Sequence, residues 1–432
     1  MRRRGSLSVS LVLLAVLVTG CGGRSPAGFS SPPATLSGGA WRPAAHCPVG
    51  MRLGKVAYIH AGALFLLDLD RCRRRALAAR GAAPPVAFSG DGRWLAFGSL
   101  PEILRLDGGT GAVPAFQVAA TQWEWSPRGA ALAESGRDGS LRLRFALDGE
   151  RVLEPAGFGV ESFAWARSGR TLEIGRHLYR GAGGSAGPRD VQQLLALGVG
   201  GGSPRLLYRT PRGQIAPPVA AGFSPDGQWA FFWPDLQSSA SLAADGMPLR
   251  VVAVRGGPAR TVVNAMLLVK DWIAFCRSRA VIVAGAGRFT LSGKRLVAAG
   301  APGWRPRTLT SAARLSWVSP ECAPGGRLLA TAAGRSQRTF RRLDLQHRSL
   351  WLLNPGTGSR RRLTTPPSQP SASDELPRWS ADGRYILFLR QGRSAHERTD
   401  HYDIEVVRLR DRRVFGPLGR ISDPAASAYA NA

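Results

Sequence analysis

Cys21 is the residue whose position most clearly indicates chemistry, because its thiol follows an export sequence. Ahead of it stand three arginines at positions 2–4 and an apolar run from Leu7 to Val18, with the small residues Thr19 and Gly20 directly before the cysteine. A basic start, a short apolar segment and small residues are the parts of a secretory signal peptide. About a dozen apolar residues are fewer than the roughly 18–20 that cross a bilayer as a helix. The chain is therefore expected to be exported.

The run Leu17-Val18-Thr19-Gly20-Cys21 resembles the lipobox of bacterial lipoproteins. The resemblance implies removal of residues 1–20 as a lipoprotein signal peptide and attachment of diacylglycerol, with palmitate-type acyl chains, to Cys21. A generic signal peptide with an incidental cysteine is the alternative. The implied location is the extracytoplasmic face of the cell membrane, with membrane lipid bound through Cys21.

Other candidates for chemistry are weaker. The chain has no Gly-x-Ser-x-Gly elbow, no phosphate-binding loop and no Cys-x-x-Cys pair. The best metal candidate is the segment from His396 to Asp403, whose two histidines are five positions apart instead of the four that share a helix face. A solvated polar loop between strands is the simpler interpretation. We expect no catalytic residue, no metal and no cofactor.

The segment from residue 46 to residue 421 is predicted to be the folded domain, and it must position any functional site. Residues 21–45 begin with Cys21 and continue in Gly, Ser, Pro, Ala and Thr, a composition typical of a flexible tether. Residues 422–432 are interpreted as a C-terminal tail. The roughly 390 residues from the end of the tether onward are long for one core but suit a repeat architecture.

A short pattern recurs along this segment: an aromatic, a small residue, a turn containing Asp-Gly, then an alternating apolar run. The turns of its clearest copies are Asp91-Gly92, Asp226-Gly227 and Asp382-Gly383. Aspartate bonds its own backbone, and glycine accepts the positive φ of a tight turn, so each copy predicts a β-hairpin. Each unit supplies about four strands, and no convincing helix separates the units. The chain is predicted to be all-β, a propeller of eight four-stranded blades, or seven if the N-terminal unit only completes the last blade.

The Phe-Ser and Trp-Ser pairs before these turns resemble the WD-like (WD40-like) repeats of TolB-type propellers, over about residues 50–420. The resemblance implies a β-propeller and leaves function open. One hypothesis is a membrane-anchored binding scaffold whose propeller face or channel holds a protein or glycan partner of the cell envelope. The alternative is an enzyme, a hydrolase or lyase, with its site at the channel mouth. Six histidines in the chain, with no motif spanning blades, favour the scaffold.

Four cysteines remain once Cys21 is lipidated, an even number in an oxidising compartment. Cys47 and Cys72 fall in the first and third turns of the first blade, on one face, and are predicted to form a disulfide. Cys322 also lies in a first turn, whereas Cys276 is placed at the end of a second strand, near the opposite face. A Cys276–Cys322 disulfide would require a different register, and a buried free thiol is the alternative for Cys276.

The formal net charge of +29 indicates anionic lipid or a wall polymer as a partner. Only Lys55, Lys270 and Lys294 are lysines, however, and a GC-rich coding sequence would give the same excess of arginine. The export sequence argues against nucleic acid. The densest basic runs, residues 71–75 and 360–362, are expected at strand ends or turns, where solvated loop charge is the simpler explanation.

Overall fold

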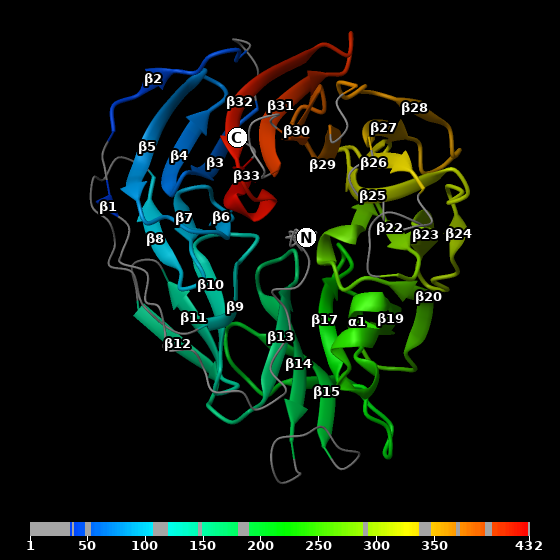
Figure 1. Cartoon of the computed structure of the whole chain (residues 1–432). Coiled ribbons are helices and arrows are strands. Elements are labelled where there is room, and N and C mark those ends of the chain that lie inside the picture. Colours follow the sequence, from blue (N-terminus) through cyan, green and yellow to red (C-terminus); the bar gives the residue numbers. More distant parts are fainter. Residues whose placement is uncertain are drawn as a thin grey trace, which may run out of the picture.

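Eight β-sheets surround a central axis in the computed structural model (Figure 1). The structure describes residues 35–36, 39–47, 53–106, 120–145, 149–179, 190–287, 293–336, 347–368, 372–393 and 400–430. The helical elements within these ranges are short: α1 (Ala240–Asp245), η1 (Leu236–Ser238), η2 (Lys270–Trp272) and η4 (Pro424–Ala426). No helix in the described ranges is long and apolar enough to cross a membrane. The fold is an all-β propeller of eight blades.

Blades 3 to 8 are antiparallel sheets of four consecutive strands, with the first strand innermost. Blades 3 to 5 comprise β9 (Ala120–Trp125), β10 (Ala131–Gly136), β11 (Leu141–Phe145), β12 (Gly149–Glu154); β13 (Val160–Trp165), β14 (Thr171–Leu178), β15 (Val191–Gly198), β16 (Arg205–Arg209); and β17 (Pro218–Phe223), β18 (Trp229–Pro234), β19 (Met247–Ala253), β20 (Arg260–Met266). Blades 6 to 8 comprise β21 (Ile273–Cys276), β22 (Arg279–Ala284), β23 (Arg295–Gly300), β24 (Arg307–Thr308); β25 (Leu315–Cys322), β26 (Leu329–Arg335), β27 (Ser349–Leu353), β28 (Arg360–Arg362); and β29 (Ser373–Trp379), β30 (Tyr385–Arg393), β31 (Asp400–Arg408), β32 (Val414–Ile421). Blade 2 shows three strands in its described part, β6 (Val86–Phe88), β7 (Trp94–Phe97) and β8 (Glu102–Arg105).

Both ends of the chain build blade 1, which closes the ring. Its strands β3 (Lys55–His60), β4 (Ala63–Asp68) and β5 (Arg73–Arg80) come from the N-terminal part, and the innermost strand β33 (Ser427–Ala430) comes from the C-terminus and pairs with β3 (Figure 1). The prediction of a tail over residues 422–432 is therefore wrong.

The boundary of the predicted tether also moves. Two short strands, β1 (Thr35–Leu36) and β2 (Arg42–Pro43), pair with β5, so the last part of residues 21–45 joins blade 1. Both differences come from backbone pairing between segments distant in sequence, which composition does not report.

The Asp-Gly turns are hairpins between the first and second strands of blades 2, 5 and 8. In blade 5, Ser224 Oγ donates to Asp226 at 2.5 Å, the Trp229 amide donates to Ser224 Oγ at 3.0 Å, and Gly227 has φ +69°. Gly92 and Gly383 have φ of +66° and +68°. The serine and aspartate close the turn, and glycine adopts a conformation that other residues resist.

The aromatic at the start of the repeat joins neighbouring blades. The indole nitrogen of Trp125 donates to the Ala87 carbonyl of blade 2 at 3.1 Å, and that of Trp165 donates to the Glu124 carbonyl of blade 3 at 3.0 Å. Trp379 in blade 8 makes the same bond to the Glu321 carbonyl of blade 7 at 2.9 Å. A buried indole both packs and satisfies a backbone acceptor, so each such tryptophan fixes one blade against the preceding one.

We predict that Gly227→Val lowers the free energy of unfolding by about 1–3 kcal/mol, because valine resists positive φ. A Cβ at Gly227 would meet no atom within 4 Å, so the cost is purely conformational. Gly227→Asn is expected to cost less, since asparagine tolerates this region. Gly200 has equally open surroundings and no positive φ, and Gly200→Val serves as the control. Equal thermal shifts for Gly227→Val and Gly200→Val would contradict the prediction.

Two disulfides are present, Cys47–Cys72 within blade 1 and Cys276–Cys322 between blades 6 and 7. The sequence-based placement of Cys276 at the end of a second strand is wrong. Cys276 ends β21, the first strand of blade 6, and Cys322 ends β25, the first strand of blade 7. Equivalent ends of neighbouring first strands lie side by side, which brings the two Cα atoms to 5.4 Å.

Candidate functional site

The innermost strands of blades 7 and 8 share a local distortion that directs a charge toward the axis. In β25 the pairing register shifts between Val318 and Glu321, across Ser319-Pro320, and Ser319 has φ +51°. In β29 the equivalent residues are Leu376, with φ +50°, then Pro377 and Arg378. An extra residue in one strand bends it and re-aims the next side chain. The two blades thereby present opposite charges to each other, and Arg378 Nη1 lies 3.5 Å from Glu321 Oε2.

The link that enters blade 6 adds two further charges. Lys270, at the start of η2, donates from Nζ to the Phe163 carbonyl of blade 4 at 2.6 Å and to Glu124 Oε2 of blade 3 at 3.2 Å. The next residue, Asp271, accepts from Arg378 Nη2 of blade 8 at 2.8 Å. Blades 3 and 8 lie on different sides of blade 6, so these contacts cross the axis. We call Glu124, Lys270, Asp271, Glu321 and Arg378 the axial network.

Glu173 is a buried carboxyl beside the axial network. Its side chain in β14 is fully buried, and Oε2 accepts from the Gly222 amide of blade 5 at 2.6 Å. Burial raises its pKa well above the ordinary value, against the hydrogen bond from Gly222 and the charge of Lys270, which lower it. Glu173 thus supports the distorted part of β17 at Gly222.

A cavity of about 720 Å³ opens beside the axial network, between blades 1, 2 and 8. Its wall is formed by β33, by β6 with the following hairpin, and by β29 and neighbouring strands of blade 8. Aliphatic side chains line much of it, including Val56, Leu387 and Ile404, and Arg378 is part of the wall. This volume is in the range of small-molecule and peptide-segment sites. The cavity and the axial network therefore share Arg378.

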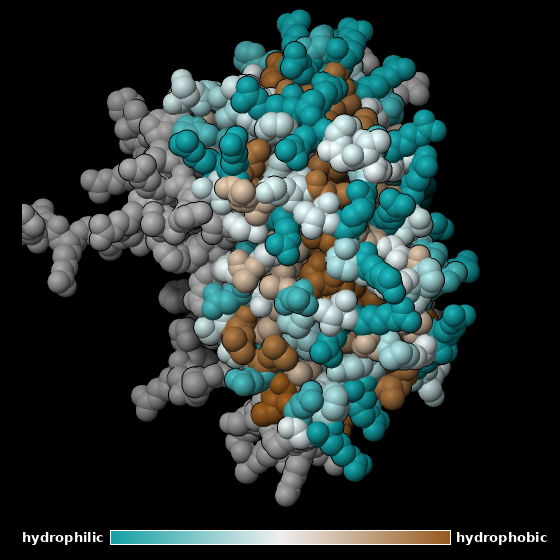
Figure 2. Space-filling model, turned by 90° about the vertical axis from the view of Figure 1, so that its right-hand side faces the viewer, coloured by the Kyte–Doolittle hydropathy of each residue, from teal (hydrophilic) through white to brown (hydrophobic). Residues whose placement is uncertain are grey.

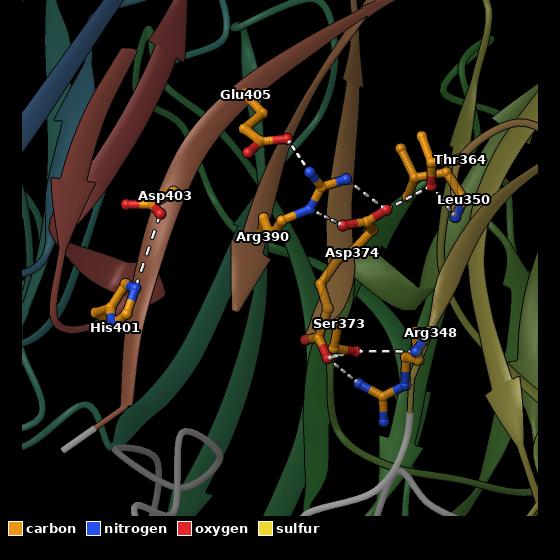
Figure 3. Close-up of polar contacts among 10 residues, drawn as sticks. Arg348, Leu350, Thr364, Ser373, Asp374, Arg390, His401, Asp403 and Glu405 are labelled. Carbon is orange, nitrogen blue, oxygen red and sulfur yellow. Dashed lines mark hydrogen bonds and ion pairs between the residues drawn. The ribbon is translucent and has the colours of Figure 1, made fainter. Parts of the chain in front are cut away.

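A second polar cluster joins blades 7 and 8 (Figure 3). Arg390 of β30 lies between two carboxylates. Its Nε is 2.7 Å from Asp374 Oδ1, and its Nη1 is 2.7 Å from Glu405 Oε2. Thr364 of blade 7 donates to Asp374 Oδ2 at 2.5 Å, and Arg348 pairs with Glu375. Burial raises the pKa of Glu405 to about 7, with Arg390 lowering it and Asp374 raising it. The charged side chains of this cluster are paired with one another and hold blade 8 against blade 7.

The metal candidate from the sequence is only partly within the described residues. His396 lies outside them. His401 and Asp403 belong to β31, so the interpretation of this part as a loop is wrong, and His401 Nε2 is 3.7 Å from Asp403 Oδ2. Among the described residues, no group of three or more His, Cys, Asp or Glu side chains is arranged to hold a metal ion.

Sequence reasoning missed the axial network. Lys270 and Asp271 interrupt an apolar run between Ala265 and Cys276, and Pro320 lies outside the repeated turn pattern. A usable pattern was present, since Pro320-Glu321 and Pro377-Arg378 both place a charge after proline late in a first strand. The turn residues named from the sequence lie elsewhere, except Asp91 and Gly92, which form part of the cavity wall.

Among known proteins, the matches to this chain are solved structures. No family model matches the chain, and no curated protein matches it. Among solved structures, dipeptidyl peptidase 4 of Porphyromonas gingivalis superposes with a TM-score of 0.55 at 11% identity, over 90% of this chain and 60% of that one. A eukaryotic initiation factor gives 0.51 at 12% identity, over 88% of each chain. At these identities the likeness concerns the fold alone.

TolB proteins are also among the similar structures. A putative TolB from Agrobacterium tumefaciens gives a TM-score of 0.36 at 15% identity, over 64% of this chain and 91% of that chain. At this TM-score the similarity supports no conclusion about this chain. The chain is an eight-bladed propeller, and its resemblance to TolB stays a sequence-based expectation.

Proposed function

We propose that this protein is a membrane-anchored extracytoplasmic binding scaffold that holds a protein or glycan partner of the cell envelope at the cavity between blades 1, 2 and 8. The observation that carries the proposal is the cavity itself, about 720 Å³ in volume, whose wall combines aliphatic side chains with polar groups such as Asp91 and the guanidinium of Arg378. Walls that combine apolar side chains with oriented polar groups are typical of binding sites. The anchor rests on the lipobox that ends at Cys21.

The charges beside the cavity suit a preformed binding surface. Asp271 and Glu321 hold the Arg378 guanidinium from two sides, and Glu124 with the Phe163 carbonyl holds the Lys270 ammonium. Side chains held in this way lose little rotamer freedom when a partner binds.

The alternative, a hydrolase or lyase, needs an acid or base that reaches a substrate. Burial raises the pKa of Glu173 and of Glu405, and both side chains are buried, which disfavours an enzyme that uses either group. Burial also raises the pKa of Glu321, which is partly exposed beside the cavity, but its carboxylate is paired with Arg378.

Site-specific photocrosslinking in intact cells tests the proposal. A photoreactive residue at Ala428, in the cavity wall, is expected to capture a discrete partner, whereas the same residue at Ala425, exposed and outside the wall, is not. Filling the cavity with Ala428→Trp should abolish co-purification of that partner, and Ala425→Trp should preserve it. Cys21→Ser should release the protein from the membrane fraction. Capture of the same species from both positions, or none from Ala428, would contradict the proposal.

A further inference from the structure

Acidic residues predominate on the innermost strands of this propeller, and arginines predominate on the outermost strands. On the described innermost strands the acidic residues are Glu124, Glu161, Glu321, Asp374 and Glu375, and Arg378 is the sole basic residue. The outermost strands of blades 3 to 8 carry arginine as their basic residue, with only Glu150 and Glu154 acidic. Their arginines are Arg151, Arg205, Arg209, Arg260, Arg307, Arg360, Arg361, Arg362 and Arg420. A GC-rich coding sequence accounts for the abundance of arginine but not for this sorting.

The outer arginines of blades 5, 6 and 7 form a continuous stretch. Arg260 on β20 donates to the Pro302 carbonyl of blade 6 at 3.0 Å, and Arg307 on β24 donates to the Pro355 carbonyl of blade 7 at 2.7 Å. Arg360–Arg362 then make up the whole of β28, and all three are exposed. The expectation that this run lies at a strand end or turn is wrong. We call Arg260, Arg307 and Arg360–Arg362 the rim arc.

The charges of the rim arc are not paired with carboxylates in the described part of the chain. In Figure 2, which views the molecule from this side, hydrophilic side chains cover much of the visible surface and hydrophobic ones form smaller patches between them. An exposed row of like charges attracts an anionic partner more strongly than it stabilises the fold.

We propose that the rim arc binds a flexible, phosphate-bearing polymer of the cell envelope. Guanidinium groups offer paired N–H donors that match phosphate oxygens, and phosphodiester groups keep their charge at all physiological pH values. The rim is convex, so a flat bilayer would touch it over a short part, whereas a flexible chain follows it across three blades. The rim arc lies on the outside of the ring, so this inference does not depend on the cavity between blades 1, 2 and 8.

Binding of long-chain inorganic polyphosphate to the full-length protein in detergent tests the proposal. The variant replaces all five rim-arc arginines with glutamine. The control replaces five exposed arginines of the inner hairpin turns, Arg93, Arg167, Arg170, Arg327 and Arg384, and so makes the same change in net charge. At about 0.1 M salt we expect the rim variant to bind at least 10-fold more weakly and the control less than 3-fold more weakly. The slope of log K against log salt should fall by about 3 for the rim variant. Thermal unfolding verifies that both variants are folded.

Three results would overturn the proposal. Equal loss in the two variants would show that net charge alone attracts the polymer. Equal affinity for polyglutamate would remove the preference for phosphate. In a third experiment, the protein is floated with anionic or with neutral phospholipid vesicles. If replacing the rim-arc arginines reduced binding to the anionic vesicles more than to the neutral ones, and left polyphosphate binding unchanged, the surface would be assigned to a bilayer.

Discussion

Replacing Arg390 with methionine is expected to lower the free energy of unfolding by about 3–5 kcal/mol, because it leaves two carboxylates buried without their cation. Asp374 is completely buried, and the Glu405 side chain is 8% exposed. Asp374 would keep the hydroxyl of Thr364 as its hydrogen-bond donor, but it would lose the charge of the Arg390 guanidinium. Because Thr364 and Asp374 belong to adjacent blades, the loss should loosen the packing of blade 8 on blade 7.

Denaturant unfolding at pH 8 measures this effect. Arg408→Met, on the next strand, removes an arginine whose partner Asp411 is exposed, and it is expected to shift the unfolding midpoint far less. Equal shifts for the two variants would show that the buried cluster contributes no more than a surface ion pair.

The variant Glu405→Gln tests the raised pKa of Glu405 through the pH dependence of the free energy of unfolding. The pKa of Glu405 is raised from its ordinary value of 4.5 to about 7, with burial as the main cause. Between these two values the folded protein binds a proton that the unfolded chain does not, so stability falls as the pH rises from 4.5 to 7. Glutamine carries no charge, so Glu405→Gln should remove this fall and exceed the wild type by about 1–3 kcal/mol at pH 8. Parallel stability curves of the two proteins from pH 4 to pH 8 would contradict the assignment.

Removing the disulfide between blades 6 and 7 is expected to cost about 4 kcal/mol. Cys276 and Cys322 are 46 residues apart, and in the chain-entropy model a cross-link over this length restricts the unfolded chain by that amount. The variant Cys276→Ala/Cys322→Ala keeps small apolar side chains at both positions, and so limits changes in packing.

Chemical unfolding with and without a reductant separates the two disulfides. The double variant should remain sensitive to reductant through Cys47–Cys72, whose separation of 25 residues predicts a contribution of about 3–4 kcal/mol. Free thiols at Cys276 and Cys322 in unreduced protein from an oxidising compartment would contradict the prediction, as would an unchanged unfolding midpoint in the variant.

The sequence by itself determined the repeating unit and the all-β propeller fold, with eight or seven blades. Both depend on local chemistry: Ser224, Asp226 and Gly227 close a hairpin within four residues, and the alternating apolar run that follows defines the next strand. Such interactions can be read from adjacent residues, because their partners are set by position in the chain.

Only the tertiary structure decided how the ring closes, which strand contains Cys276, and which residues form the axial network and the cavity. Strand β33 pairs with a segment from the other end of the chain, and Lys270 reaches Glu124 across 146 positions of sequence. No local pattern specifies such partners, since the closing of eight blades into a ring is what brings them together. The cavity beside Arg378 has the same origin, because its wall combines residues of the first, second and last blades.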